Sequence, residues 1–209
     1  MNKKVYILRH GETEYNRLGI VQGSGVDSEL NAVGQRQARL FYEKYKDKPF
    51  EVVLTSELQR THQTVRNFID AGLKWERHIE INEMNWGIHE GKKGTPESIA
   101  EYANIKQGWA QGLIDSRIEG GESARELGQR LQVFVNQLLT RTEEHILVCS
   151  HGRSMCGLVT LMMGHPIERM NEHRHSNTGL WIAEQQGQIF NFLLRNDLTH
   201  LGQEEKVLY

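Results

Sequence analysis

The chain has 209 residues, with 25 Lys or Arg against 27 Asp or Glu, which gives a formal net charge of −2. Charged residues make up 25% and hydrophobic residues 38%, the composition of an ordinary globular protein. These values exclude a disordered chain, collagen and a miniature scaffold that depends on disulfides. We therefore expect one domain over residues 1–209 that carries an insertion.

Charge patterning and apolar runs exclude further classes. No block of five like charges appears, so we expect no nucleic-acid partner. The first apolar run has four residues before a charge, too few for a signal peptide, and no run approaches the ~20 residues that span a bilayer. We expect a cytoplasmic protein without a membrane partner, and the pattern leaves homo-oligomer formation open. Cys149 and Cys156 are expected to be buried thiols rather than a disulfide.

The first quarter of the chain alternates predicted strands and helices. An apolar run at residues 5–8 predicts a buried strand. Between residues 31–46, apolar side chains recur with the period of a helix that packs on a flat surface. A second strand is expected at 50–54. Ser56 and Gln59 then form a predicted capping box, with which a second helix would begin.

The middle of the chain is less regular. A weaker strand is expected at residues 79–81. Residues 85–121 contain seven glycines and two tryptophans without a clean period, so we expect an insertion or lid there. Trp86 and Trp109 would either line a substrate pocket or anchor this segment.

Regular patterns return in the second half. A capping box at Ser123 and a strong apolar stripe over 127–139 predict a helix. A strand at 146–149, a helix over 155–162 and a strand pair between 180 and 194 follow. Uniformly apolar strands that alternate with helices predict an α/β fold, a three-layer α/β/α sandwich around a mostly parallel sheet.

Ligands of such sheets bind at the carboxyl ends of the strands. The polar residues that follow the predicted strands are Arg9, His10, Arg60, Glu83 and His151. Four separate segments would thus bring two arginines, two histidines and a glutamate to one edge. We expect a single site there.

This set of residues suits chemistry on a phosphate ester. Two arginines can neutralise a dianion and bind its oxygens with two parallel hydrogen bonds each. Backbone N–H groups near Gly11 and at the start of the helix near Gly152 would add donors. A histidine kept neutral by nearby positive charge can attack phosphorus while the second braces the transferring oxygens. A carboxyl group can protonate the leaving alkoxide and later take a proton from water, which completes a phosphomonoester hydrolase.

The segment Leu8-Arg9-His10-Gly11-Glu12-Thr13 resembles the signature of the histidine phosphatase (phosphoglycerate mutase-like) superfamily. Other segments are similar in type and order, so the resemblance spans nearly the whole chain. They are Leu30–Ala38, Ser56–Thr61, Asn82–Gly87, Gly120–Ser123, Ser150–Gly152 and Asn196–Leu201.

The resemblance implies that His10 is the phosphorylated nucleophile and Glu83 the proton donor. The expected contacts of the phosphate and the rest of the substrate are Arg9, Asn16, Gln22, Gly23, Arg60, His151 and Gly152. It implies a small phosphate ester as partner, with neither metal nor cofactor. Ile88 and His89 stand where relatives often carry Asp-Trp, which leaves specificity open. Glu90 is a second carboxylate candidate, but the family's acid aligns with Glu83.

Three functions are compatible with these residues. A phosphatase and a phosphoglycerate mutase-type enzyme would share these catalytic residues, but the modest insertion, with Arg117 as its only arginine, favours hydrolysis. A zinc enzyme or binding module would use His10, His151 and Glu83. The two arginines would repel the cation, which disfavours it.

Two further expectations concern the residue after the second histidine and the remaining histidines. The acid-phosphatase branch of the family takes its acid from the residue directly after the second histidine, and Gly152 occupies that place here. That branch is therefore excluded. The remaining candidates His173, His175 and His200 lie in loop-like sequence and are expected to be solvated or hydrogen-bonded rather than catalytic.

Overall fold

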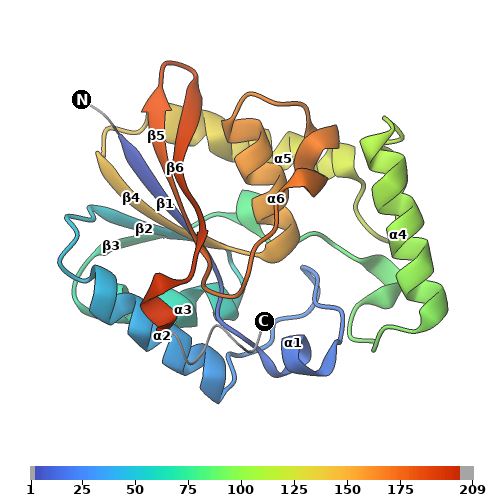
Figure 1. Cartoon of the computed structure of the whole chain (residues 1–209), viewed down its shortest axis with the longest axis horizontal. Coiled ribbons are helices and arrows are strands. Elements are labelled where there is room, and N and C mark those ends of the chain that lie inside the picture. The colour runs from blue at the N-terminus through green and yellow to red at the C-terminus, as the bar shows by residue number, and fades with distance from the viewer. Residues whose placement is uncertain (1–2, 203–209) are drawn as a thin grey trace.

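The computed structural model describes residues 3–202, which form a six-stranded sheet with helices on both faces (Figure 1). The strands are β1 (Lys4–Arg9), β2 (Val52–Thr55), β3 (Lys74–Arg77), β4 (His145–Ser150), β5 (Leu180–Gln186) and β6 (Ile189–Asp197). Their order in the sheet is β3-β2-β4-β1-β5-β6. The first four strands in that order pair in parallel. Strand β5 pairs antiparallel with both of its neighbours, β1 and β6. The expected α/β fold with a mostly parallel sheet is confirmed.

Two pairs of helices cover the sheet. The helices are α1 (Glu14–Leu18), α2 (Ala32–Tyr45), α3 (Gln59–Asp70), α4 (Pro96–Ala110), α5 (Ala124–Thr140) and α6 (Gly152–Met162). Val5 and Ile7 of β1 pack with α5 and α6, whereas Tyr6 and Leu8 pack with α2 and α3. Because both faces of β1 are buried, the strand has no polar alternation, which is why its sequence is continuously apolar.

One predicted capping box is confirmed and the other is wrong. Ser123 Oγ accepts from Glu126 N at 3.2 Å, and Glu126 Oε2 accepts from Ser123 N at 2.8 Å, so α5 begins as expected. Helix α3 instead begins after Leu58, without a side-chain cap. The Ser56 hydroxyl accepts from Leu58 N at 3.1 Å and also contacts His151, so it belongs to the site described below.

The strand predicted at residues 79–81 is also wrong, because those residues form the short 3₁₀ helix η1 (Ile79–Ile81). The third strand of the sheet is β3, whose side chains are largely exposed. An edge strand with one neighbour and open faces carries no apolar run, so hydropathy alone did not reveal it.

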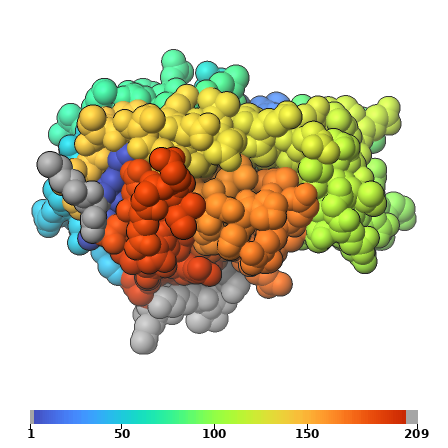
Figure 2. All heavy atoms as spheres, turned by 90° about the horizontal axis from the view of Figure 1, so that it is seen from above, coloured from blue at the N-terminus to red at the C-terminus, as the bar shows by residue number. Residues whose placement is uncertain are grey.

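The segment 85–121, predicted as irregular, contains η2 (Gly87–His89) and the fifteen-residue helix α4. Thr95 caps α4, with Pro96 as its first residue. Figures 1 and 2 show this segment as an extension at one end of the molecule, beside the residues coloured orange. Trp109 is fully buried and donates to the Ser116 carbonyl at 2.7 Å, so it anchors the segment.

The remaining elements are two short 3₁₀ helices, η3 (Ile167–Glu172) and η4 (Thr199–Leu201). Cys149 and Cys156 are buried free thiols, as predicted. No helix within residues 3–202 has both the length and the apolar character needed to cross a membrane.

Candidate active site

The site lies where β1 and β4 end side by side. The two strands are parallel, with Arg9 opposite Ser150, so the next residues, His10 and His151, leave the sheet together. Their ring centroids are 5.2 Å apart. Both imidazoles are buried, with exposed fractions of 3% and 0%.

The hydrogen bonds of His10 define its protonation. Its Nδ1 lies 2.7 Å from the Gly11 carbonyl, which can only accept, so Nδ1 carries the proton and Nε2 keeps a lone pair. Burial lowers the pKa of His10 well below its ordinary value, and the charges of Arg60 and Arg9 lower the pKa further. The geometry therefore presents a neutral imidazole that can act as a nucleophile through Nε2.

His151 takes the opposite tautomer. Arg60 Nε can only donate, and it lies 3.1 Å from His151 Nδ1, so that nitrogen accepts. In the neutral ring Nε2 then carries the proton and donates to Ser56 Oγ at 2.8 Å. Burial lowers the pKa of His151 well below its ordinary value, and the positive charge of Arg60 lowers it further. The Nε2–H of His151 thus points at the Ser56 hydroxyl, a partner that an anion could replace.

Arg60 comes from the first turn of α3 and is completely buried. Its Nη1 donates to the Val26 carbonyl at 2.6 Å and its Nη2 to the Gly23 carbonyl at 3.3 Å. Burial lowers its pKa to about 10, so it stays charged at neutral pH. Arg60 forms no ion pair within residues 3–202. A buried cation in this state is costly until an anion binds to it.

Glu83 follows the 3₁₀ helix η1 rather than a strand, which corrects the reason given for its position. Its Oε1 accepts from Met84 N at 2.8 Å and Ser154 N at 3.0 Å, and its Oε2 from Arg153 N at 3.1 Å. The carboxylate therefore lies on the N-terminus of α6, one turn from His151. The 7% exposed side chain lines two pockets, one of about 480 Å³ with Arg9 and one of about 400 Å³ with Arg130.

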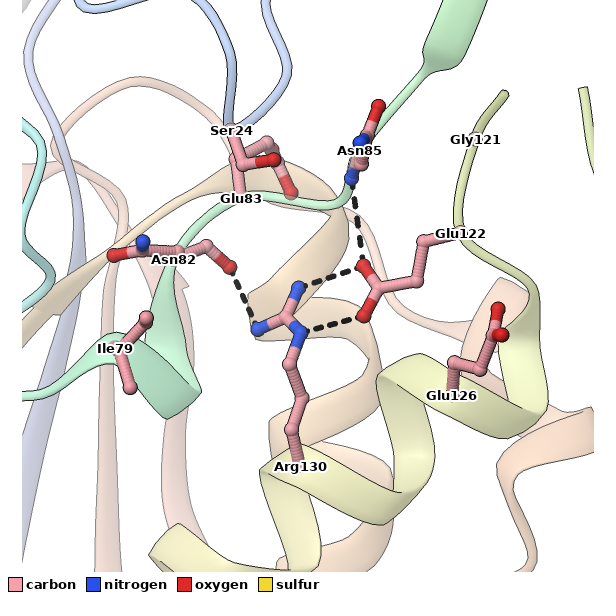
Figure 3. A pocket seen from close by; sticks show the side chains of 9 residues that line it. All are labelled: Ser24, Ile79, Asn82, Glu83, Asn85, Gly121, Glu122, Glu126 and Arg130. Atoms are coloured by element: carbon pink, nitrogen blue, oxygen red, sulfur yellow. Dashed lines mark hydrogen bonds and ion pairs between the residues drawn. The ribbon is translucent and has the colours of Figure 1, made fainter. Parts of the chain in front are cut away.

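The second of these pockets is drawn in Figure 3, where Glu83 and Ser24 lie together on one side. On the opposite side Arg130 binds Glu122 with two hydrogen bonds, of 2.6 and 2.9 Å. Arg130 also donates to the carbonyls of Glu80 at 2.6 Å and Asn82 at 2.9 Å. This paired arginine thereby fixes the backbone that carries Glu83.

The other predicted contacts surround the histidines. Arg9 Nη1 donates to the His175 carbonyl at 2.8 Å, and Gly152, the first residue of α6, lies against the Arg9 guanidinium. Asn16 Oδ1 accepts from Asn177 Nδ2 at 3.3 Å, and the same Asn177 nitrogen donates to the His10 carbonyl at 2.9 Å. Asn16 is thus connected to the backbone of His10.

Gln22 and Gly23 belong to the loop whose Gly23 and Val26 carbonyls accept from Arg60. Gln22 Oε1 accepts from Thr13 Oγ1 at 2.9 Å. Glu90 Oε2 accepts from Gly25 N at 2.9 Å and its Oε1 from Trp86 N at 2.8 Å. A Cβ atom on Gly23 would lie 1.8 Å from Glu90 Oε1, so glycine is required there. Glu90 therefore fixes this loop by its hydrogen bonds.

The three additional histidines differ in their surroundings. His200 is buried and hydrogen-bonded to Thr178 Oγ1 at 3.0 Å, which agrees with the expectation. Both ring nitrogens of His175 are buried and lack hydrogen-bond partners within residues 3–202, so the expectation that this ring is solvated or hydrogen-bonded was wrong. In His173 only Nε2 is in that state. Chain folding places both rings at the pocket that Arg9 and Glu83 share.

Sequence reasoning missed several residues that hold the site. Thr64 Oγ1 accepts from Gly11 N at 2.9 Å, and Asn177 binds the His10 carbonyl as described above. Neither lies in a recognisable motif. Ser56 carried a signal that was read as a helix cap. In the part of the chain that the structure describes, no group of three or more His, Cys, Asp or Glu is placed to hold a metal ion.

The chain is similar to known proteins over nearly its whole length. The family description "Histidine phosphatase superfamily (branch 1)" matches residues 5–198. A Serratia proteamaculans protein named "Probable phosphoglycerate mutase GpmB" is 31% identical over 214 residues, covering 95% of this chain and 94% of that protein. "Putative phosphoserine phosphatase 2" of Hydrogenobacter thermophilus is 25% identical over 202 residues, covering 96% and 98%. The crystal structure of the α-ribazole phosphatase from Shigella flexneri has a TM-score of 0.81 at 26% identity, covering 93% and 96%.

Proposed function

Because this chain belongs to the histidine phosphatase superfamily, we propose that its hydrolysis of phosphomonoesters proceeds through a phosphohistidine on His10. The observation that carries the proposal is a buried neutral imidazole with its Nε2 lone pair available, beside the buried charge of Arg60, which has no ion-pair partner between residues 3 and 202. Together they supply a nucleophile and a site for the anion that the nucleophile attacks.

The first half of the reaction forms the phosphoenzyme. His10 Nε2 donates its lone pair to phosphorus, and the bond from phosphorus to the ester oxygen breaks with its electron pair leaving on that oxygen. Glu83, in its protonated form, transfers its proton to the departing alkoxide. Arg9, Arg60 and His151 bind the three transferring oxygens, on which negative charge is concentrated.

The second half releases phosphate. Water attacks the phosphorus of phosphohistidine while the Glu83 carboxylate, now ionised, takes a proton from it. The bond from Nε2 to phosphorus breaks, and its electrons restore the lone pair on His10. Because Nδ1 of His10 is held by the Gly11 carbonyl throughout, the ring keeps its orientation during both steps. The products are an alcohol and inorganic phosphate.

A mutase reaction is the second candidate, because several relatives at 30–32% identity are named "Probable phosphoglycerate mutase GpmB". The two reactions differ in what receives the phosphoryl group. With 3-phosphoglycerate as the substrate, we expect inorganic phosphate and glycerate to accumulate, with no 2-phosphoglycerate. Phosphorus NMR of the mixture separates these products. Formation of 2-phosphoglycerate faster than phosphate release would favour the mutase.

The role of Glu83 is tested by the choice of leaving group. An alkoxide must be protonated as it departs, whereas a nitrophenolate leaves without a proton. Glu83→Gln should therefore lower kcat/KM for an alkyl phosphate by roughly 10²-fold or more and for p-nitrophenyl phosphate by much less.

Glu90→Gln is the matched control. Like Glu83, Glu90 accepts backbone N–H groups, from Gly25 and Trp86, but these bonds fix the loop near Gly25. It should affect alkyl and aryl substrates alike. A selective loss on alkyl phosphates in Glu90→Gln, with no selectivity in Glu83→Gln, would assign the proton transfer to Glu90.

A further inference from the structure

The pocket that Arg9 and Glu83 share is strongly cationic. Its volume is about 480 Å³. The residues of its lining that matter here are Arg9, Glu83, Tyr102, Lys106, Arg153 and Arg174. Building on the phosphatase function above, we propose that this pocket binds a second anionic group, a carboxylate or a second phosphate, on the alcohol part of the ester.

The leaving alcohol has to enter a pocket that Glu83 borders, because Glu83 protonates the oxygen that departs. Glu83 lines two pockets of different character. The one in Figure 3 contains Glu122 and Glu126, and its arginine, Arg130, is already paired with Glu122. The other contains no carboxylate except Glu83 among the described residues of its lining. Only the second pocket is suited to an anion.

Three of the cations that line this pocket have no acidic partner among the described residues. Lys106, Arg153 and Arg174 form no ion pair within residues 3–202. By contrast, Arg125 and Arg141, outside the pocket, are paired with carboxylates. Like charges gathered around one cavity repel one another, and an anion between them removes that repulsion. The arrangement therefore favours a negatively charged ligand.

Arg153 is held in place by neutral groups that leave its charge uncompensated. Its Nη1 donates to Asn171 Oδ1 at 2.9 Å, and its Nη2 donates to the Tyr102 hydroxyl. Its Nε is buried without a hydrogen-bond partner among the described residues. Asn171 is itself fixed by its Nδ2, which donates to the Lys106 carbonyl at 2.9 Å. This arginine is thus oriented before any ligand arrives, which lowers the entropy cost of binding.

The insertion supplies the second cation. Tyr102 and Lys106 lie four residues apart on α4 and so share one face of that helix. Lys106 Nζ is 5.2 Å from the centroid of the Tyr102 ring, whose face stabilises the ammonium group. Arg174 is exposed at the pocket and adds charge from the chain after η3. Three separate segments therefore place positive charge around one space.

The lining of the pocket includes three residues of the candidate site, Arg9, Glu83 and Gly152. Arg153 is two residues after His151, and its own N–H holds Glu83 Oε2 at 3.1 Å. A substrate whose phosphate lies on His10 and Arg60 would direct its alcohol past Glu83 toward the Arg153 side chain. The preferred substrates are then small phosphomonoesters with a second negative charge.

Matched substrates test this on the wild-type protein. O-phosphoserine and O-phosphoethanolamine differ only by a carboxylate, and 1,3-propanediol bisphosphate and 3-hydroxypropyl phosphate differ only by a phosphate. We expect kcat/KM to be about tenfold or more higher for the anionic member of at least one pair. The pair with the larger ratio identifies whether the pocket takes a carboxylate or a phosphate. Ratios near one in both pairs, with hydrolysis measurable, would overturn the inference while leaving the phosphatase function intact.

Variants locate the effect. Lys106→Gln and Arg153→Gln should each bring the higher ratio down toward one, mainly through a raised KM for the anionic substrate. Lys48→Gln, which removes an exposed lysine far along the chain from these segments, should leave the ratio unchanged. Because the ratio compares two substrates on one variant, a general loss of activity does not affect it. If Arg153→Gln fails to fold, Lys106→Gln decides alone, and an unchanged ratio there would contradict the proposal. Absence of phosphate release from every ester would instead count against the phosphatase function itself.

Discussion

Replacing His10 with alanine is expected to remove essentially all phosphate release, from alkyl and aryl esters alike. The proposed reaction needs a lone pair at Nε2 of His10, and the neighbouring His151 cannot supply one, because its Nδ1 accepts from Arg60 and its Nε2 donates to Ser56. Phosphate release measured at high enzyme concentration gives the residual rate. Retention of more than a few per cent of the wild-type rate would show that another group attacks phosphorus.

His200→Gln is the matched control for this variant. His200 is also a buried histidine, but its ring packs against Phe41 and Tyr45 and binds the Thr178 hydroxyl. Its loss should lower the thermal midpoint and leave kcat near the wild-type value. Comparable losses of kcat in both variants would indicate that His10→Ala acts through folding.

Replacing Arg60 with lysine is expected to lower kcat/KM by about 10² to 10³, although the charge is kept. The guanidinium donates to His151, Val26 and Gly23, and in the proposed reaction its remaining N–H groups bind the phosphate. A single ammonium group cannot reproduce this division of donors. Loss of one preorganised donor to a transition state is typically ~3–4 kcal/mol, which corresponds to this range.

Arg66→Lys is the matched control, because Arg66 lies on the same helix, is exposed and pairs with Asp70. It should have little effect on kcat/KM, because the Arg66–Asp70 pair is exposed and contributes little to the stability of the fold that positions the site. A loss of tenfold or less in Arg60→Lys would mean that the phosphate does not bind to this guanidinium.

The features that sequence predicted well are those with a strong local cause. Strands β1 and β4 are buried on both faces and therefore continuously apolar, and the first residues after them are the two histidines. The Ser123 capping box is completed within four residues of chain. Where the pattern and the structure depend on the same few neighbours, the pattern is sufficient.

The errors arise where distant contacts decide. Ser56 has the sequence of a helix cap, but His151, 95 residues further along, binds its hydroxyl. Residues 79–81 form a 3₁₀ turn whose position Arg130 fixes through the Glu80 carbonyl. Helix α4 buries only Gly108 and Trp109 among its fifteen residues, so it has no apolar stripe to recognise.

The cationic pocket was beyond sequence reasoning for a related reason. Arg153, Lys106 and Arg174 are ordinary charged residues in the sequence, and most such residues are solvated or paired. Their significance depends on which carboxylates lie within reach of each, and that is a property of the folded chain. The position of Arg153, two residues after His151, was the one local hint of its proximity to the site.

The most direct test is to trap the phosphoenzyme. Wild-type protein mixed with p-nitrophenyl phosphate and quenched in alkali during turnover should carry one phosphoryl group, which tandem mass spectrometry places on His10. The group should be absent from His10→Ala, and it should be lost from the wild type no more slowly than turnover. A phosphoryl group on Ser56 or His151, or the absence of any phosphoenzyme together with an active His10→Ala variant, would contradict the account.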